Sequence, residues 1–182
     1  MLSSVCILGR QPALGLAELE SLFGADKLLP MQNGAALIDV EHQEVPFSRL
    51  GGTIKLAKLL TILDTTDWGK IEKFLTESVV PHTEYLPPGK MNLGLSVYGL
   101  NITPARINAT ALTVKKIIRD HGRSVRIIPN KASALSSAQV LHNNLTGPRS
   151  WELIFVEHAG TTYVAQTVEI QDINAYAARD QE

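Results

Sequence analysis

Residues 91–122, MNLGLSVYGLNITPARINATALTVKKIIRDHG, contain a strand pattern followed directly by a helix pattern. Apolar residues alternate with others over 91–99, which is the period of a half-buried β-strand. Thr103 and Pro104 then supply an N-cap and a first helical residue, and Gly122 ends the helix. The apolar stripe is spaced four, three and four residues apart, at Ile107, Ala111, Val114 and Ile118. This sequence predicts a β-α unit packed on a sheet.

The β-α unit is followed by three more strand patterns and one more helix pattern. Short apolar runs predict strands at 125–129, 151–156 and 161–168. Ser133 is the expected N-cap of a helix over about 134–145. Four side chains of this helix are expected to face inward: Ala134, Ala138, Leu141 and Leu145. The order β-α-β-α-β-β predicts a compact α/β layer with two helices on a sheet.

The first 65 residues form a smaller α+β pattern. Asn33-Gly34 is a strong hairpin signal, and the run 53–63 fits either a strand or a helix. Glu18 and Glu20 are expected on the outer face of the first helix. The predicted elements are a strand at 5–9, a helix from Pro12 to Gly24, a hairpin of 27–31 and 35–40, and the run at 53–63. Together they predict a small α+β sandwich.

A helix and a break join the two patterns. The cluster Thr65-Thr66-Asp67 predicts the N-cap of a helix over about 68–80. Residues 81–90 include three prolines, at 81, 87 and 88, and predict a linker-like break.

The composition is typical of a globular chain. Hydrophobic residues make up 45% and charged residues 19%. No apolar run reaches the length that crosses a bilayer, and Met1–Ser4 lacks the basic residues of a signal peptide. Cys6 is the sole cysteine, so it forms no internal disulfide, and its apolar surroundings indicate a buried small hydrophobe. We therefore expect a cytoplasmic protein without a membrane partner.

Charge is distributed unevenly along the chain. The net charge is −1, but residues 101–150 contain eight basic side chains and a single acid, Asp120. The first hundred residues and the last thirty-two are both net acidic. A basic block in a near-neutral protein is typical of a polyanion site. The alternative is a solvated surface in which cations complement a helix C-terminus.

The candidate RNA-binding residues come from this block and from the predicted start of the next helix. Lysine and arginine neutralise phosphates, and the polar segment 130–137 would place backbone N–H groups at a helix N-terminus. Ordinary capping by Ser133 is the alternative for that segment, and Gln139, His142 and Asn143 are possible base readers. The predicted contacts are Lys115, Lys116, Arg119, Arg123, Arg126, Lys131, Ser136, Gln139 and Arg149.

Signatures of catalysis are missing from the sequence. Its five histidines show no metal-ligand spacing, and neither a nucleophile elbow nor a phosphate-binding loop occurs. Tyr85-Leu86-Pro87-Pro88-Gly89 is interpreted as a linker. The sequence predicts no catalytic residue, no metal ligand and no cofactor bound by these 182 residues.

Three stretches resemble the tRNA guanosine-N2 methyltransferases. The first is 8–20, LGRQPALGLAELE, which is similar to the opening of that family, and the second is 50–55, LGGTIK, similar to the end of its N-terminal ferredoxin-like domain. The third comprises QTVEIQDI at 166–173 and YAARD at 176–180, similar to the exit from the family's THUMP domain into a linker.

The resemblance implies an α+β chain with a ferredoxin-like domain at 1–65, a THUMP-like RNA-binding domain at 66–171 and the start of a linker at 172–182. It implies that the THUMP-like domain grips the acceptor end of tRNA, or another structured RNA. It also implies that S-adenosylmethionine binds a separate C-terminal methyltransferase domain that would be the partner of this chain. On this interpretation the chain is an inactive fragment of an RNA methyltransferase. The alternative is a docking scaffold of a methylase that acts on ribosomal RNA or DNA, with little RNA affinity of its own.

Overall fold

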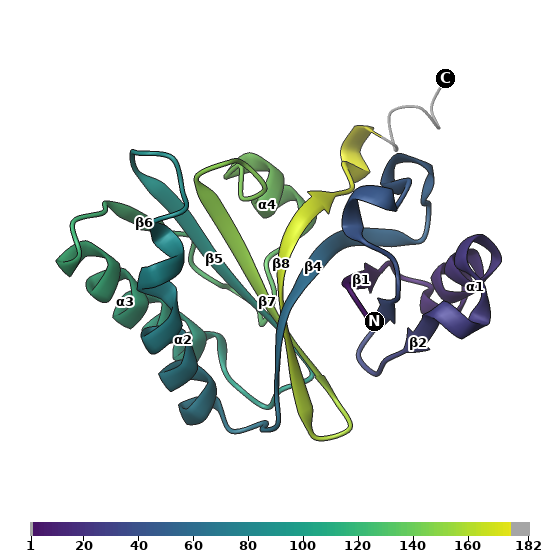
Figure 1. Ribbon diagram of the computed structural model, residues 1–182, viewed down its shortest axis with the longest axis horizontal. Helices are drawn as coiled ribbons and strands as arrows, with labels where there is room; N and C mark the ends of the chain where they lie inside the picture. The colour runs from purple at the N-terminus through teal and green to yellow at the C-terminus, as the bar shows by residue number, and fades with distance from the viewer. Residues whose placement is uncertain (1, 176–182) are drawn as a thin grey trace.

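The computed structural model describes residues 2–175 and shows one eight-stranded mixed sheet with α-helices packed on it (Figure 1). The predicted α+β class is confirmed. The order in the sheet is β2-β3-β1-β4-β8-β7-β5-β6. The elements are β1 (Ser4–Leu8), α1 (Pro12–Phe23), β2 (Leu28–Pro30), β3 (Ala35–Ile38), β4 (Thr53–Leu63), α2 (Trp68–Thr83), β5 (Met91–Tyr98), α3 (Pro104–Asp120), β6 (Val125–Ile127), α4 (Ser137–His142), β7 (Ser150–His158) and β8 (Thr161–Ile170).

The sheet is continuous across the two predicted domains. β4 pairs with β1 on one side and with β8 on the other, both antiparallel, so the run 53–63 is a strand. β5 is parallel to β6 and β7, as expected for the β-α-β connection through α3. The domain boundary near residue 65 stays a prediction, and most of the predicted linker at 172–182 lies outside the described residues.

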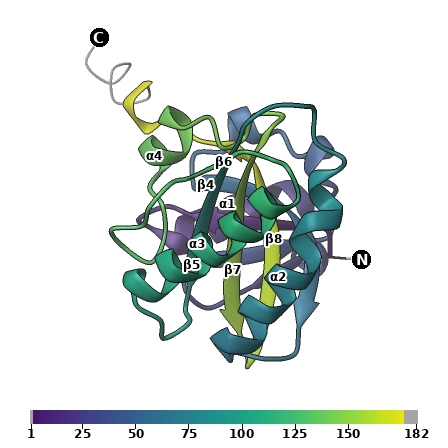
Figure 2. The same cartoon turned by 90° about the vertical axis from the view of Figure 1, so that its left-hand side faces the viewer.

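Three helices cover one face of the sheet, and α4 covers the other. In β5, Leu93 and Leu95 pack in the core beneath α2 and α3, whereas a side chain at Gly94 would meet Leu135 and Leu145 beside α4. The alternation of side chains along a strand therefore places α4 opposite α2 and α3. Figure 2 shows α2 and α3 side by side in front of the sheet. The predicted stripe of α3 is buried throughout.

The sheet curls so that its two halves face each other. Asn33, in the β2–β3 turn, donates from Nδ2 to the Glu157 carbonyl of β7 at 3.3 Å. β3 and β7 are four strand spacings apart in the sheet order, or about 19 Å in a flat sheet. A core cluster on the concave face accordingly contains Val5 and Leu37 from one half and Ile154 from the other.

Two predicted local features are confirmed and two differ. The hairpin turn has positive φ at Asn33 and Gly34, and Asp67 caps α2 by accepting from the Lys70 N–H. However, α2 continues through Pro81 to Thr83, although the proline has no N–H to donate within the helix. Glu18 does not simply face solvent, since its carboxylate accepts from the backbone N–H groups of Gly51 and Gly52, both at 2.8 Å.

A buried ion pair joins the two halves on the α4 side of the sheet. Lys55 Nζ of β4 lies 2.6 Å from Glu152 Oε2 of β7, and the two residues are 1% and 0% exposed. Ser96 of β5 donates to the same oxygen at 2.8 Å, and Thr167 of β8 donates to Glu152 Oε1 at 2.5 Å. The four neighbouring strands β4, β8, β7 and β5 thus each contribute one side chain to this cluster, the Lys55–Glu152 network.

Three titrating groups, two of them buried and one half-buried, have raised pKa values. Burial raises the pKa of the Cys6 thiol from 9.0 to about 12, and burial also raises the pKa of Tyr98 above 10.0. Burial by itself would lower the pKa of Lys55, but the charge of Glu152 and contacts with Tyr98 raise it above 10.5. Each group keeps its proton more tightly when folded, so each contributes stability at neutral pH that is lost as pH rises.

No helix among residues 2–175 has the length and apolar character needed to cross a membrane.

We expect the folded protein to shield Cys6 from a thiol reagent and to lose stability above about pH 9. Thiol titration at about pH 8, just below the ordinary thiol pKa, should show reaction only when urea is added. The free energy of unfolding should fall between pH 9 and pH 12. Fast modification of the native protein would contradict the buried position of Cys6.

We expect Lys55→Met to destabilise the fold by about 3–5 kcal/mol, because it leaves the Glu152 carboxylate buried without its ion-pair partner. The double substitution Lys55→Met/Glu152→Met should cost less, since no lone charge remains. Urea unfolding of both variants measures the difference. A double variant less stable than the single one would contradict this account.

Candidate nucleic-acid interface

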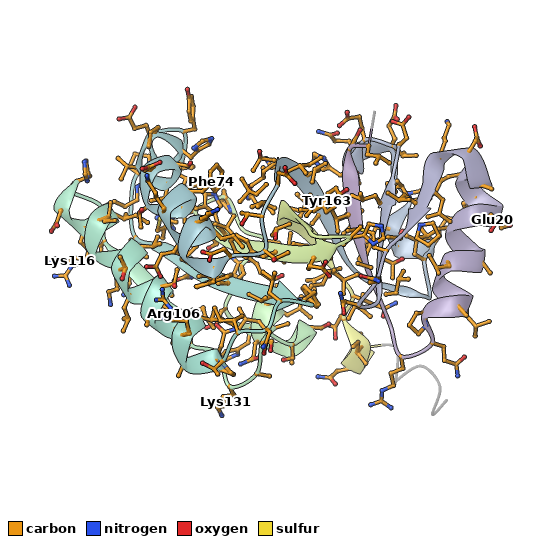
Figure 3. The ribbon with its side chains drawn as sticks, turned by 90° about the horizontal axis from the view of Figure 1, so that it is seen from below. Glu20, Phe74, Arg106, Lys116, Lys131 and Tyr163 are labelled. Carbon is orange, nitrogen blue, oxygen red and sulfur yellow. The ribbon has the colours of Figure 1, made fainter. Side chains whose placement is uncertain are left out.

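The basic residues predicted for RNA binding lie in the part of the fold built from α3, β6 and the loops beside them. The stripe that includes Val114 and Ile118 faces the sheet, so Lys116 and Arg119 of α3 are exposed and Lys115 is half-buried. Arg126 is exposed on β6, which forms the edge of the sheet, and Lys131 is exposed in the following loop. In Figure 3, Lys116 lies at the end of the molecule opposite α1 and its Glu20, and Lys131 lies nearer the middle.

Five of the basic side chains in this region have no hydrogen bond or ion pair with other residues of the 2–175 range: Lys115, Lys116, Arg119, Arg126 and Lys131. Arg106, by contrast, is paired with Glu72 of α2 at 2.9 Å. Cations without a partner raise the positive potential around them, which attracts a polyanion. We call these five residues the basic surface.

Two of the predicted contact residues have partners within the protein. Arg123 donates to the carbonyl oxygens of Leu86, Pro87 and Gly89 at 2.9–3.2 Å. Arg149 donates to the Pro88 carbonyl at 3.3 Å. Both guanidinium groups therefore hold the loop between α2 and β5, and their role as RNA contacts stays a prediction.

The helix predicted from Ser133 begins later and is shorter. α4 spans Ser137–His142 and is capped by Ser136, whose hydroxyl accepts from the Gln139 N–H at 3.2 Å. Gln139 Oε1 accepts in return from the Ser136 N–H at 2.9 Å, which completes a capping box. Ser133, Ser136 and Ser137 are all possible caps by residue type, and the reciprocal glutamine selects Ser136.

This shift changes the roles expected in the segment. Ser136 and Gln139 form the cap of this helix, although Ser133 was the expected cap, and their contact with RNA stays a prediction. Ala138 and Leu141 were expected to face inward but are exposed. The helix begins at Ser137 instead of near residue 134, so different residues face the sheet. Leu145 is buried as predicted, and Val140 and Leu135, which were not predicted, fill the core on this face with it.

Residues 130–136 form an irregular loop that is nevertheless held at several points. Asn130 donates its N–H to Asn108 Oδ1 at 2.8 Å, and Asn108 Nδ2 donates to the Asn130 carbonyl at 3.0 Å. Asn130 Nδ2 also donates to the Leu95 carbonyl at 2.8 Å, and the Val97 N–H donates to the Ser133 carbonyl at 2.9 Å. We call this segment the held loop; its position relative to α3 is fixed by the two asparagines.

Sequence reasoning missed these asparagines, because their partnership spans 22 residues and has no local signature. Two of the three buried side-chain atoms that lack a hydrogen-bond partner in the described chain lie near the ends of the held loop, Asn130 Oδ1 and Ser137 Oγ. A buried polar atom left without any partner costs about 1–3 kcal/mol. Within residues 2–175, no group of three or more His, Cys, Asp or Glu side chains could hold a metal ion.

We expect Arg123→Ala to loosen the loop between α2 and β5, because it removes three hydrogen bonds to that loop. Trypsin should then cleave faster after the exposed Lys90. The control is Arg126→Ala, which removes a side chain without a partner in the described chain. It should leave this cleavage rate unchanged, and its free energy of unfolding should stay within about 0.5 kcal/mol of that of the unaltered protein. Equal cleavage rates in the two variants would contradict the structural role of Arg123.

No family model matches the chain, and no curated protein matches its sequence. Solved structures do match its fold. TrmN from Thermus thermophilus superposes with a TM-score of 0.55 at 11% identity, over 94% of this chain and 46% of that protein. A possible methylase from Clostridium difficile 630 superposes with a TM-score of 0.50 at 11% identity, over 91% of this chain and 41% of the other.

A 4-thiouridine synthetase, solved with RNA and ATP, gives a TM-score of 0.48 at 10% identity, over 94% of this chain and 42% of that one. The chain spans less than half the length of each of these three proteins. At such low identities the likeness concerns the fold, and this chain therefore has the fold of part of TrmN and of part of the possible methylase.

Proposed function

We propose that this chain binds structured RNA through the basic surface and serves an S-adenosylmethionine-dependent RNA methyltransferase of the guanosine-N2 type. The acceptor end of tRNA is its proposed target. The observation on which the proposal rests is the set of five cationic side chains that no acid of the described chain neutralises. Protein cations without protein partners are available to phosphates, and their contributions to affinity add up.

Two further observations support the proposal. The sequence resembles the tRNA guanosine-N2 methyltransferases at its opening and in the segment 50–55. The fold is similar to part of a protein described as a possible methylase. We infer that residues 66–171 form a THUMP-like RNA-binding unit and that residues 1–65 form a ferredoxin-like unit beside it.

The proposal assigns S-adenosylmethionine binding and methyl transfer to a further domain of the parent protein. No stretch of this sequence matches the glycine-rich loop or the Asn-Pro-Pro-Tyr motif of that chemistry. On this view the chain alone is inactive, and a cytoplasmic location follows from its RNA substrate.

A second candidate function is a docking scaffold for the catalytic domain of a methylase acting on ribosomal RNA or DNA. It predicts exposed apolar side chains in residues 1–65. Leu14 and Leu22 of α1 are 64% and 43% exposed, and Leu60 and Ile62 of β4 are 48% and 51% exposed. This function does not require the chain alone to bind RNA, so RNA affinity distinguishes the two.

We expect Lys115→Glu/Lys116→Glu/Arg119→Glu to weaken binding of a tRNA transcript by at least about tenfold, because three cations that would neutralise phosphates become anions. The slope of log affinity against log salt should fall by about three, since each substituted residue would no longer displace a counterion. Fluorescence anisotropy over a range of salt concentrations measures both quantities with the complete 182-residue chain.

The matched control is Arg10→Glu/Lys27→Glu/Arg49→Glu, which makes the same charge change on exposed residues of the first half. We expect it to retain most of the affinity. Equal losses in both triple variants would show a net-charge effect instead of a site, and absence of salt-dependent binding by the unaltered chain would favour the scaffold.

A further inference from the structure

The Lys55–Glu152 network holds the backbone of the held loop at Leu135. Lys55 Nζ donates to the Leu135 carbonyl at 2.8 Å, in addition to its bond with Glu152. The Leu135 N–H donates to Ser96 Oγ at 2.9 Å, and that hydroxyl donates onward to Glu152 Oε2. Both backbone polar groups of one loop residue are therefore bound by a cluster rooted in the sheet.

Stability by itself does not account for an ion pair at this place. Desolvation of two charges largely cancels their attraction, so a buried pair is roughly neutral compared with apolar residues of the same size. What the pair does supply is geometry, because a fully satisfied buried network admits one arrangement of its members. Here one of those members is the loop backbone.

The loop so fixed is the one that presents Lys131. Asn130, just before that lysine, is anchored to Leu95 and Asn108, and Leu135, four residues after it, is anchored to Lys55 and Ser96. Lys131 lies between these two anchors and is itself exposed. Because the loop is fixed at both ends, its backbone needs little further ordering when the exposed cation meets a phosphate.

We infer that Lys55, Glu152 and Ser96 are positioning residues of the RNA site: they fix the held loop so that Lys131 is pre-organised for phosphate. This inference rests on the proposed function. The inference also gives the segment 50–55 a role at the RNA site. Lys55, the last residue of that segment, is bonded to Glu152 in the second half of the chain and is itself buried, so it would not contact RNA.

Two substitutions in the network separate positioning from stability. Ser96→Ala removes the acceptor of the Leu135 N–H, whereas Thr167→Val removes a donor to the other oxygen of the same carboxylate and leaves both backbone bonds of Leu135 intact. Both leave the ion pair in place, so both are expected to fold. Hydrogen exchange of the amides at 131–136 and tRNA affinity are then measured on the complete chain.

We expect Ser96→Ala to speed exchange at Leu135 and its neighbours and to weaken tRNA binding about fivefold. Thr167→Val should change both quantities much less, because both backbone bonds of Leu135 remain. In a Lys131→Ala background, Ser96→Ala should have little additional effect on affinity, since the residue that it positions is gone.

Three outcomes would overturn the positioning role, and a fourth would overturn the proposed function. Equal affinity losses in Ser96→Ala and Thr167→Val, or a loss for Ser96→Ala that persists in full without Lys131, would overturn the positioning role. Faster loop exchange with unchanged affinity would overturn it too. If the unaltered chain binds no tRNA, the proposed function fails, whatever the exchange data show.

Discussion

A carboxylate and an ammonium group buried together in a sheet require every hydrogen-bonding position around them to be filled. In this protein the Glu152 carboxylate is met by Lys55, Ser96 and Thr167, which come from three other strands. A shift of β4 by one residue would turn Lys55 to the other face and leave the Glu152 charge uncompensated. The same shift of β5 or β8 would take a hydrogen-bond donor away from that carboxylate. The need to pair and hydrogen-bond the Glu152 carboxylate therefore helps to specify how β4, β8, β7 and β5 pair. The same need fixes the position of the loop that is bonded to Lys55.

The basic block of the sequence divides into two chemical populations once the backbone is placed. Arg106, Arg123 and Arg149 are bonded to other parts of the protein and hold α2 or the loop that follows it. The residues of the basic surface have no such partner in the described chain. Arginine has a planar, multidentate donor group, which suits the binding of several carbonyls at once. Residue type and sequence position did not distinguish these populations, since both occur within a few residues of each other.

Periodicity and capping predicted most of the helices and strands, because those signals are local. The stripe of α3, the Asn33-Gly34 turn and the Asp67 cap are examples. The start of α4 could not be predicted as well, since three serines compete and the choice depends on a reciprocal bond to Gln139. The Lys55–Glu152 pair joins residues 97 positions apart. In the sequence this pair is indicated by a single acid, Glu152, inside the apolar run 151–156. No local pattern identifies Lys55 as its partner.

The position of β8 has a consequence for the order in which the chain assembles. β8 is the last strand of the described chain, yet it lies in the middle of the sheet between β4 and β7 (Figure 1). During synthesis from the N-terminus, both of these strands emerge before the strand that joins them, each with an unpaired edge. Closing the sheet is then a late, long-range event, which is the slow kind of folding step. A nascent chain that ended before Thr161 would contain both halves of the ion pair but not the strand that lies between them.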